Sequence, residues 1–145
     1  LRGTEFKHAN LRRAFLEEAN LREVILHDAK LEWARLNRVN LREAKLQDAH
    51  LEHAELKMAD LTSAKLERAD LTDAKLQEAD LRQADLHGTK LHRANLEYTI
   101  LDEEQLHYID KSADLKNVRV YLEKCGKIVS YRRYCKMERQ KGERE

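Results

Sequence analysis

A leucine or phenylalanine occupies every fifth position from Phe6 to Leu106, and a small residue stands two places before nearly all of these anchors. A period of five fits neither regular element. On an α-helix of 3.6 residues per turn the anchors would spiral over every face, and a flat strand needs strict alternation. Within one unit, Ala59 and Leu61 share a face and Asp60 takes the other, but the next two residues break the alternation. This pattern predicts a chain that winds around a closed core.

Helix propensity favours a different fold. Ala, Leu, Glu, Lys and Arg dominate residues 9–95, and all are good helix formers, so propensity alone would predict one long helix. Propensity differences are only tenths of a kcal/mol per residue, whereas burying a leucine contributes roughly 1.5–3 kcal/mol. Only the wound chain buries every leucine, and alanine suits the second inward position because a larger side chain would overpack a narrow tube. We therefore predict an all-β solenoid.

The five-residue units resemble those of a known family. Residues 9–13 (Ala-Asn-Leu-Arg-Arg), 59–63 (Ala-Asp-Leu-Thr-Ser) and 69–73 (Ala-Asp-Leu-Thr-Asp) are similar to the Ala-(Asn/Asp)-Leu-X-X consensus of the pentapeptide repeat family. The resemblance covers roughly residues 2–108. It implies a right-handed quadrilateral β-helix of about five coils, with one repeat per side and twenty residues per coil. It does not imply an activity, because a fold does not determine function.

The repeat stops after Leu106, and the open end of a solenoid needs a cover. We therefore expect a pentapeptide-repeat β-helix over residues 1–110 and a helical cap with a basic tail over residues 111–145. The cap is predicted to contain α-helices near 114–124 and 127–140, the first with Ser112 as its N-cap. The resemblance also implies that two copies pair through residues 112–139. Candidate residues for seating the cap or for the homodimer are Tyr98, Ile100, Tyr108, Leu122, Cys125 and Val129.

Charge is distributed unevenly along the chain, although its net value is only +1. Residues 111–145 contain 11 Lys/Arg and 5 Asp/Glu, whereas residues 1–110 contain 17 and 22. The basic tail leaves three alternatives open: a capping helix with a solvated tail, the start of a helical hairpin in a longer protein, or a contact with RNA or an anionic membrane. The chain begins at Leu1, in register with the anchors, so we expect a fragment or a missing start.

Outward-facing residues twenty apart should stack in columns about 4.8 Å apart. One such column reads Arg2, Arg22, Arg42, Thr62, Arg82 and Asp102. Arg22, Arg42 and Arg82 are candidates for docking a partner that carries carboxylates or phosphates. The alternative is a solvated lattice that neutralises itself, which the acidic residues on both flanks of the column favour.

Large hydrophobic side chains at outward positions are a second candidate for a protein interface. Phe15, Ile25, Trp33 and Met58 occupy positions where the repeat expects charge. Phe15 and Trp33 should lie about one coil apart across a corner, where they would form a small apolar patch. Such a patch, surrounded by charge, is typical of an interaction site.

No motif points to catalysis, a cofactor or a metal site. The chain has four glycines and no phosphate-binding loop. His87 and His107 share a column and His92 lies on the adjoining side, but no cysteine or carboxylate completes a metal site there. We predict a non-enzymatic module without a cofactor, which acts as a protein scaffold through its rigid, rod-like charged surface.

Two alternatives to the scaffold remain. One is a targeting or regulatory module of a longer signalling or membrane protein. The other is a DNA mimic that binds a topoisomerase, which needs a strongly negative surface that this solenoid lacks. Nucleic acid is not expected as a partner, and no stretch is long and apolar enough for a transmembrane helix. The two cysteines, Cys125 and Cys135, favour free thiols in a reducing, cytoplasmic compartment.

Overall fold

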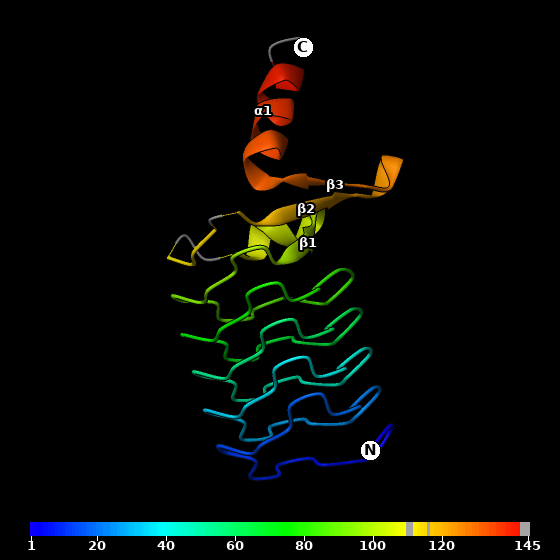
Figure 1. Cartoon of the computed structure of the whole chain (residues 1–145), viewed down its shortest axis with the longest axis vertical. Coiled ribbons are helices and arrows are strands. Elements are labelled where there is room, and N and C mark those ends of the chain that lie inside the picture. Colours follow the sequence, from blue (N-terminus) through cyan, green and yellow to red (C-terminus); the bar gives the residue numbers. More distant parts are fainter. Residues whose placement is uncertain (110–111, 116, 143–145) are drawn as a thin grey trace.

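The computed structural model describes residues 1–109, 112–115 and 117–142. Most of the chain is a four-sided tube built from stacked parallel β-bridges (Figure 1). From Glu5 to Ile100 each bridge joins residues twenty apart, such as Lys45 and Lys65. The N–H of Leu46 donates to the carbonyl of Lys65 at 2.8 Å, and the N–H of Lys65 donates to the carbonyl of Ala44 at 2.8 Å. The predicted twenty-residue coil is therefore the hydrogen-bonded repeat of the structure.

Each side of the tube ends at a tight corner. At one corner the N–H of Ala49 donates to the carbonyl of Leu46 at 3.1 Å, and the third residue of the turn, Asp48, has a φ of 58°. An aspartate or asparagine side chain supports many corners. For example, Oδ1 of Asp70 accepts the N–H of Thr72 at 3.0 Å. This hydrogen bond, which Asn and Asp make readily in turns, explains why these residues recur directly before the leucine.

The anchors and the small residues form one continuous core inside the tube. Leu56, Leu66 and Ala64 are completely inaccessible to solvent. In the first coil Phe6 and Leu11 are only partly buried, because no coil lies beneath them. Burial along the length of the tube outweighs the helix propensity of the sequence, as the leucine spacing predicts.

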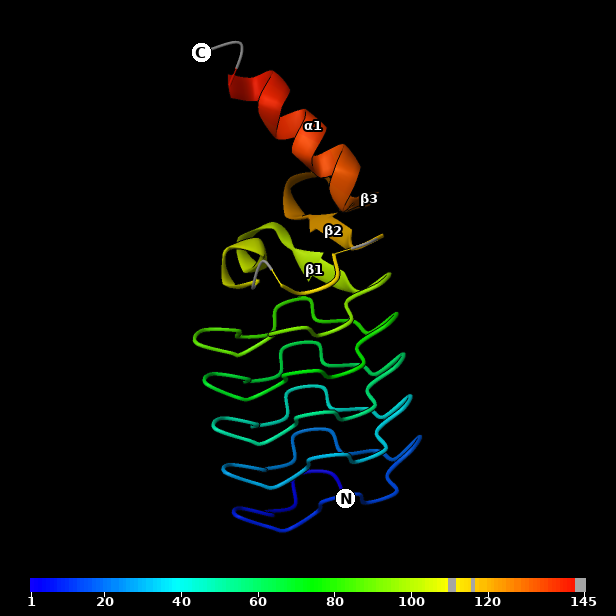
Figure 2. The ribbon, with the colours of Figure 1, turned by 90° about the vertical axis from the view of Figure 1, so that its left-hand side faces the viewer.

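The C-terminal cap combines a small sheet with one α-helix (Figure 2). In chain order its elements are β1 (Ile100–Asp102), the 3-10 helix η1 (Glu103–Tyr108), β2 (Arg119–Leu122), the 3-10 helix η2 (Glu123–Cys125), β3 (Lys127–Ser130) and α1 (Tyr131–Gly142). β1 pairs with β2 in parallel, and β2 pairs with β3 in an antiparallel hairpin. Among the described residues no helix is long and apolar enough to cross a membrane.

The α-helix predicted near 114–124 is wrong, because Asp114 forms a β-bridge and residues 119–122 form strand β2. Asp114 bridges Asn95, and the N–H of Arg119 donates to the carbonyl of Thr99 at 2.9 Å. Asn95 and Asp114 are nineteen residues apart rather than twenty. The hydrogen bond from Arg119 to Thr99 spans twenty residues, whereas the one from Lys65 to Ala44 spans twenty-one, so the chain continues the tube one residue out of register. Ala113-Asp114-Leu115 is thus one more repeat unit. Because its register is shifted, the apolar residues that follow are spaced as they would be on one face of a helix.

The second predicted helix starts later than expected. Residues 127–130 pair with β2 as strand β3, and α1 begins only at Tyr131. Gly126, with a φ of 63°, ends η2 in the left-handed conformation and lets the hairpin turn. The cap is therefore a β-hairpin followed by one α-helix.

The side chain of Gln105 closes the end of the regular tube. It is 5% exposed, and its Nε2 donates to the carbonyls of Leu81 and Ala84 at 2.6 and 2.7 Å. Its Oε1 accepts the N–H of Asp102 at 2.8 Å. One coil below, the carbonyl of Ala64 accepts a backbone N–H instead. The amide of Gln105 therefore replaces backbone partners that the next regular coil would supply.

Candidate interaction surfaces

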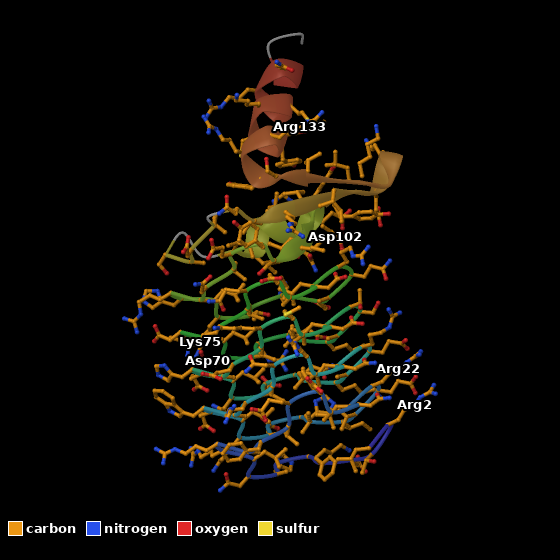
Figure 3. All side chains as sticks on the ribbon, viewed as in Figure 1. Arg2, Arg22, Asp70, Lys75, Asp102 and Arg133 are labelled. Atoms are coloured by element: carbon orange, nitrogen blue, oxygen red, sulfur yellow. The ribbon has the colours of Figure 1, made fainter. Side chains whose placement is uncertain are left out.

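The arginine column is paired with acidic residues of the same chain. Figure 3 labels Arg2 and Arg22 at one edge of the tube. The ion pairs are Arg2–Glu23 at 2.9 Å, Arg22–Glu43 at 2.8 Å, Arg42–Asp60 at 3.9 Å and Arg82–Asp80 at 2.6 Å. The arginines therefore form the neutralised lattice described above, and docking of a carboxylate-rich partner there stays a prediction.

Similar pairs shift the pKa values of carboxylates elsewhere on the tube. Arg68 donates two hydrogen bonds to Asp48 and holds the pKa of that carboxyl below its ordinary value. Arg93 has the same effect on the pKa of Asp73. Burial instead raises the pKa of Asp102. At each carboxyl group with a lowered pKa, the ionised form stabilises the folded state.

These pKa directions predict how stability depends on pH. A carboxyl with a lowered pKa in the folded state contributes stability above its unfolded pKa, which is about 3.9–4.3, and the contribution is lost as the pH falls through the folded value. Asp102 has the opposite sign, but the lowered groups outnumber it among the described residues. The thermal midpoint should stay constant from pH 8 to 6 and fall below about pH 5. A midpoint that rises on acidification from pH 6 to 3 would contradict this.

Three exposed hydrophobic residues belong to one side of the tube. Phe15 lies in the column that runs along the middle of this side, where it bridges Arg35. Trp33 lies at the corner that leads into the same side, and Met58 lies at the corner that follows it. Their exposed fractions are 73% for Phe15, 54% for Trp33 and 49% for Met58. We call this surface the Phe15 side.

Polar neighbours hold the rings of the Phe15 side in place. The guanidinium of Arg35 lies 5.1 Å from the ring centroid of Phe15. The ring of Trp33 stacks on His53, with centroids 4.1 Å apart and planes at 16°. A shallow hollow of about 300 Å³ on this side is lined by Arg35 and Met58, among others. The Phe15 side therefore presents fixed aromatic faces beside a concave region.

Two of the predicted cap residues do contact the C-terminal segment. Ile100 pairs with Arg119 across the parallel strands, and the guanidinium of Arg119 lies 5.4 Å from the ring centroid of Tyr98. Tyr108 instead meets His87 edge to face, with centroids 5.9 Å apart. Tyr98 and Ile100 thus seat strand β2 on the tube.

Two of the remaining cap residues, Leu122 and Val129, are buried within the cap itself. Leu122 and Val129 are 6% and 9% exposed, and they pack with Val120 in the small core of the cap. The side chain of Cys125 lies outside the described part of the structure. Ile128, which was not among the candidates, is 47% exposed on β3. Leu122 and Val129 are buried because β2 pairs with β3, whereas helices were predicted for these segments.

An acidic hollow of about 680 Å³ lies between the last regular coil and the cap. Its charged lining includes Asp85, Asp102, Glu103, Glu104, Glu123 and Lys124. Carboxylates predominate in this lining, so the hollow suits a basic segment better than an anionic ligand.

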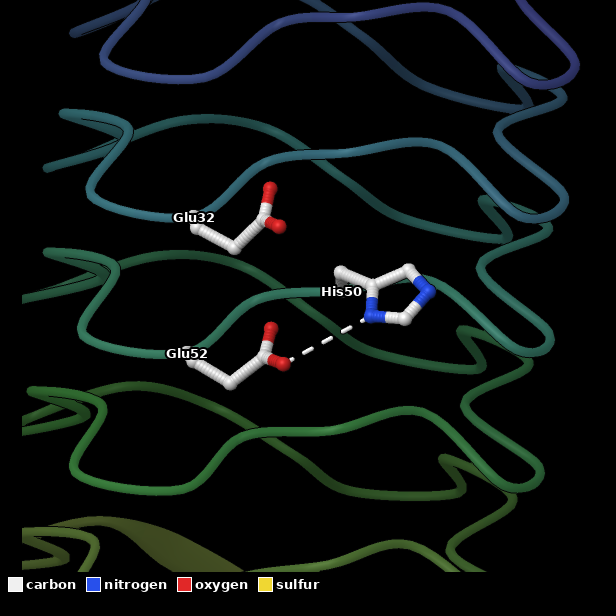
Figure 4. Close-up of side chains that lie close together, drawn as sticks. All are labelled: Glu32, His50 and Glu52. Carbon is white, nitrogen blue, oxygen red and sulfur yellow. Dashed lines mark ion pairs between the residues drawn. The ribbon is translucent and has the colours of Figure 1, made fainter.

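Two of the three histidines considered in the sequence analysis have other neighbours in the structure. His87 contacts Tyr108, and Nδ1 of His92 lies 2.7 Å from Oγ of Ser112. The one group of His, Cys, Asp or Glu residues close enough for a metal, within the part of the chain described, is Glu32, His50 and Glu52 (Figure 4). We did not anticipate this group from the sequence. The sequence did contain the necessary spacing. Glu32 is 18 residues from His50 and 20 residues from Glu52, which places the three side chains in neighbouring columns of successive coils.

Comparison with known proteins identifies the repeats. The sequence profile of the family described as pentapeptide repeats matches residues 1–38, 34–73 and 64–102, with eight copies. A comparison with curated protein sequences found no significant match.

Three solved structures illustrate the similarity. HetL, a pentapeptide repeat protein involved in heterocyst differentiation regulation in Nostoc sp. strain PCC 7120, is 28% identical with a TM-score of 0.56, and the match covers 81% of this chain and 58% of HetL. Rfr23 from Cyanothece 51142 is 27% identical with a TM-score of 0.60, covering 77% and 87% of the two chains. Trypsin-treated QnrB1, a plasmid-mediated fluoroquinolone resistance protein, is 17% identical with a TM-score of 0.50, covering 94% and 77%. The QnrB1 match shows the fold alone, and this chain spans less than two thirds of HetL.

Proposed function

The chain belongs to the pentapeptide repeat family, and from this premise we propose that it is a non-enzymatic protein-interaction module that binds a partner protein through the Phe15 side. Its right-handed β-helix is filled by leucine and alanine side chains, so the exterior supplies the binding surfaces. The regulatory role of HetL is consistent with a module that acts by contact. The cytoplasmic location expected from the cysteines stays a prediction.

The exposure of Phe15, Trp33 and Met58 on one side carries this proposal. Large aromatic side chains bury roughly 150–250 Å² each in an interface, and Trp is among the residues that contribute most to binding. Arg35 and His53 hold the two rings in defined orientations before a partner arrives. Preorganised side chains lose little entropy on binding, which favours affinity. The partner should therefore offer a complementary apolar surface.

The other surfaces support the alternatives less well. The arginine column is occupied by its own ion pairs, so a partner would have to displace them. The mixed charges of the tube do not suit a DNA mimic. A homodimer through Leu122 and Val129 is not part of the proposal, because both side chains are buried in their own cap. A targeting module within a longer protein remains compatible with the Phe15 side.

Replacing both Phe15 and Met58 by aspartate should lower partner capture at least about tenfold, because an interface loses most of its affinity when central apolar anchors are removed. The immobilised chain would be incubated with lysate of its source cells, and the captured proteins would be quantified by mass spectrometry.

Lys65→Asp is the matched control, because Lys65 is exposed in the central column of another side. This variant should retain the captured proteins. Thermal unfolding of all three chains would verify that the tube is intact. Equal capture by the double variant and the unaltered chain would refute the role of the Phe15 side.

A further inference from the structure

Glu32, His50 and Glu52 form a small cluster at the corner that carries Trp33. One potential ligand atom from each of the three side chains lies within 4.8 Å of the other two. Figure 4 shows the two glutamates extending in the same direction from successive coils, with the imidazole of His50 beside Glu52. Nδ1 of His50 lies 3.5 Å from Oε1 of Glu52. The arrangement therefore brings two carboxylates and one imidazole to a single point.

Each glutamate in the cluster has an oxygen without a partner. Oε2 of Glu32 and Oε2 of Glu52 are both inaccessible to solvent and accept no hydrogen bond. The side chains as a whole are only 15% and 27% exposed, so water screens them poorly. A buried carboxylate oxygen without a donor or a cation is costly. Two such oxygens on adjacent coils point to a ligand that carries positive charge.

Unpartnered buried oxygens also occur at equivalent corner positions, at Oε1 of Gln47 and Oε2 of Glu67. Among the described residues, however, only Glu32, His50 and Glu52 form a group of three potential metal ligands. In the Gln47–Glu67 pair, which occupies equivalent corner positions one coil apart, the amide of Gln47 lies 3.5 Å from Oε1 of Glu67. The Asp80 carboxylate is held by Arg82 at 2.6 Å. At the cluster, Arg12 binds the far side of Glu32, at Oε1, and leaves Oε2 without a donor.

We infer that Glu32, His50 and Glu52 bind a divalent transition-metal ion, with Zn²⁺ as the best match. Zinc accepts imidazole nitrogen and carboxylate oxygen, and sites with three protein ligands complete their coordination with water. Zinc–ligand bonds of about 2.0–2.2 Å place tetrahedral ligands roughly 3.4 Å apart, so small rotations of these side chains complete the site. His50 is 48% exposed and gives the ion a path from solvent. Mg²⁺ and Ca²⁺ prefer sites made of oxygen alone, and are disfavoured by the imidazole.

The test is isothermal titration of the whole chain with Zn²⁺ in a non-chelating buffer at pH 7.5, together with the emission of Trp33. Trp33 is the single tryptophan, and it follows Glu32 directly. We expect one saturable site and an emission change with the same midpoint. Glu32→Gln, His50→Gln and Glu52→Gln should each weaken the affinity at least about tenfold, since the loss of a ligand exceeds the effect of losing a group that only orients one.

His8→Gln is the matched control, because His8 and Asp28 form a similar pair 3.6 Å apart, outside the cluster. Its affinity for Zn²⁺ should stay within twofold of the unaltered chain. Thermal unfolding without metal would verify that the three glutamine variants remain folded. The inference is overturned if Zn²⁺ binds the three glutamine variants as well as it binds His8→Gln. It is also overturned if no saturable binding occurs.

Discussion

Replacing Leu66 by alanine is expected to destabilise the β-helix by about 3–5 kcal/mol. Leu66 is completely buried in the middle of the tube, and its neighbours are anchors of the same core. The stacked coils are tied to each other by backbone hydrogen bonds, so the walls cannot collapse far into the cavity. The loss therefore includes both the transfer free energy and the cavity cost. Equilibrium unfolding in urea, followed by circular dichroism, would measure the free energy of unfolding.

Lys65→Ala provides the control for this measurement. Lys65 precedes Leu66 in the same coil but points outward and is exposed. Substitutions at such surface positions usually change stability by less than about 0.5 kcal/mol. If Leu66→Ala shifted the unfolding midpoint no more than Lys65→Ala, the leucine-filled core would not be the main source of stability.

Replacing Gln105 by leucine should loosen the cap while leaving the coils intact. The leucine side chain would fit a buried position, but the carbonyl of Ala84 and the N–H of Asp102 would lose their hydrogen-bond partners. A buried backbone group without a partner costs about 1–3 kcal/mol, so the two groups together should cost the cap about 2–6 kcal/mol. Hydrogen exchange measured by mass spectrometry should show faster exchange in peptides from 112–130 and no change in peptides from 40–60.

Glu104→Gln is the matched control for Gln105→Leu, because Glu104 precedes it in η1 and is exposed. This variant should exchange like the unaltered chain. Equal exchange rates in the cap of both variants would show that the hydrogen bonds of Gln105 do not hold the cap in place.

The tube was predictable because its main determinant is local and periodic. The five-residue spacing alone predicts that anchors such as Leu66 and small residues such as Ala64 point into the tube. Burying a leucine contributes much more free energy than the differences in helix propensity, and this difference favours the tube over a helix. The columns of outward residues follow from the same count, so the pairing of Arg2 and Arg22 with acidic neighbours could be anticipated from the acidic flanks.

The cap was not predictable by the same counting. One residue fewer between coils moved Ala113-Asp114-Leu115 out of register, and the spacing of Leu115, Val118 and Leu122 then resembled a helix. The role of Gln105 was also missed, because an outward position in the repeat becomes an inward plug once the chain turns into η1. Register shifts of this kind depend on tertiary hydrogen bonds, and the periodicity of the sequence does not predict those bonds.

The candidate metal site was missed for a different reason. Glu32 and Glu52 look like ordinary surface residues, and only their side-chain conformations show that one oxygen of each is buried without a partner. The position of His50 beside them follows from the coil length, but its nearness to Glu52 depends on rotamers. The Phe15 side was partly anticipated, since Phe15 and Trp33 stood out from the sequence. That Met58 lies on the same side became clear only from the positions of the corners in the structure.

Stacking at an interval of one coil also determines how this surface would change over evolution. Asp48 faces Arg68, and Glu55 faces Lys75, so these ion pairs join residues twenty apart on successive coils. Substitutions at such pairs in a descendant lineage should therefore compensate one another at a separation of twenty. An insertion or deletion of one residue mid-tube would change the separation of every such pair that spans it, as the nineteen-residue spacing of Asn95 and Asp114 illustrates near the cap. Within the tube, length variation should therefore be tolerated best in multiples of a complete coil.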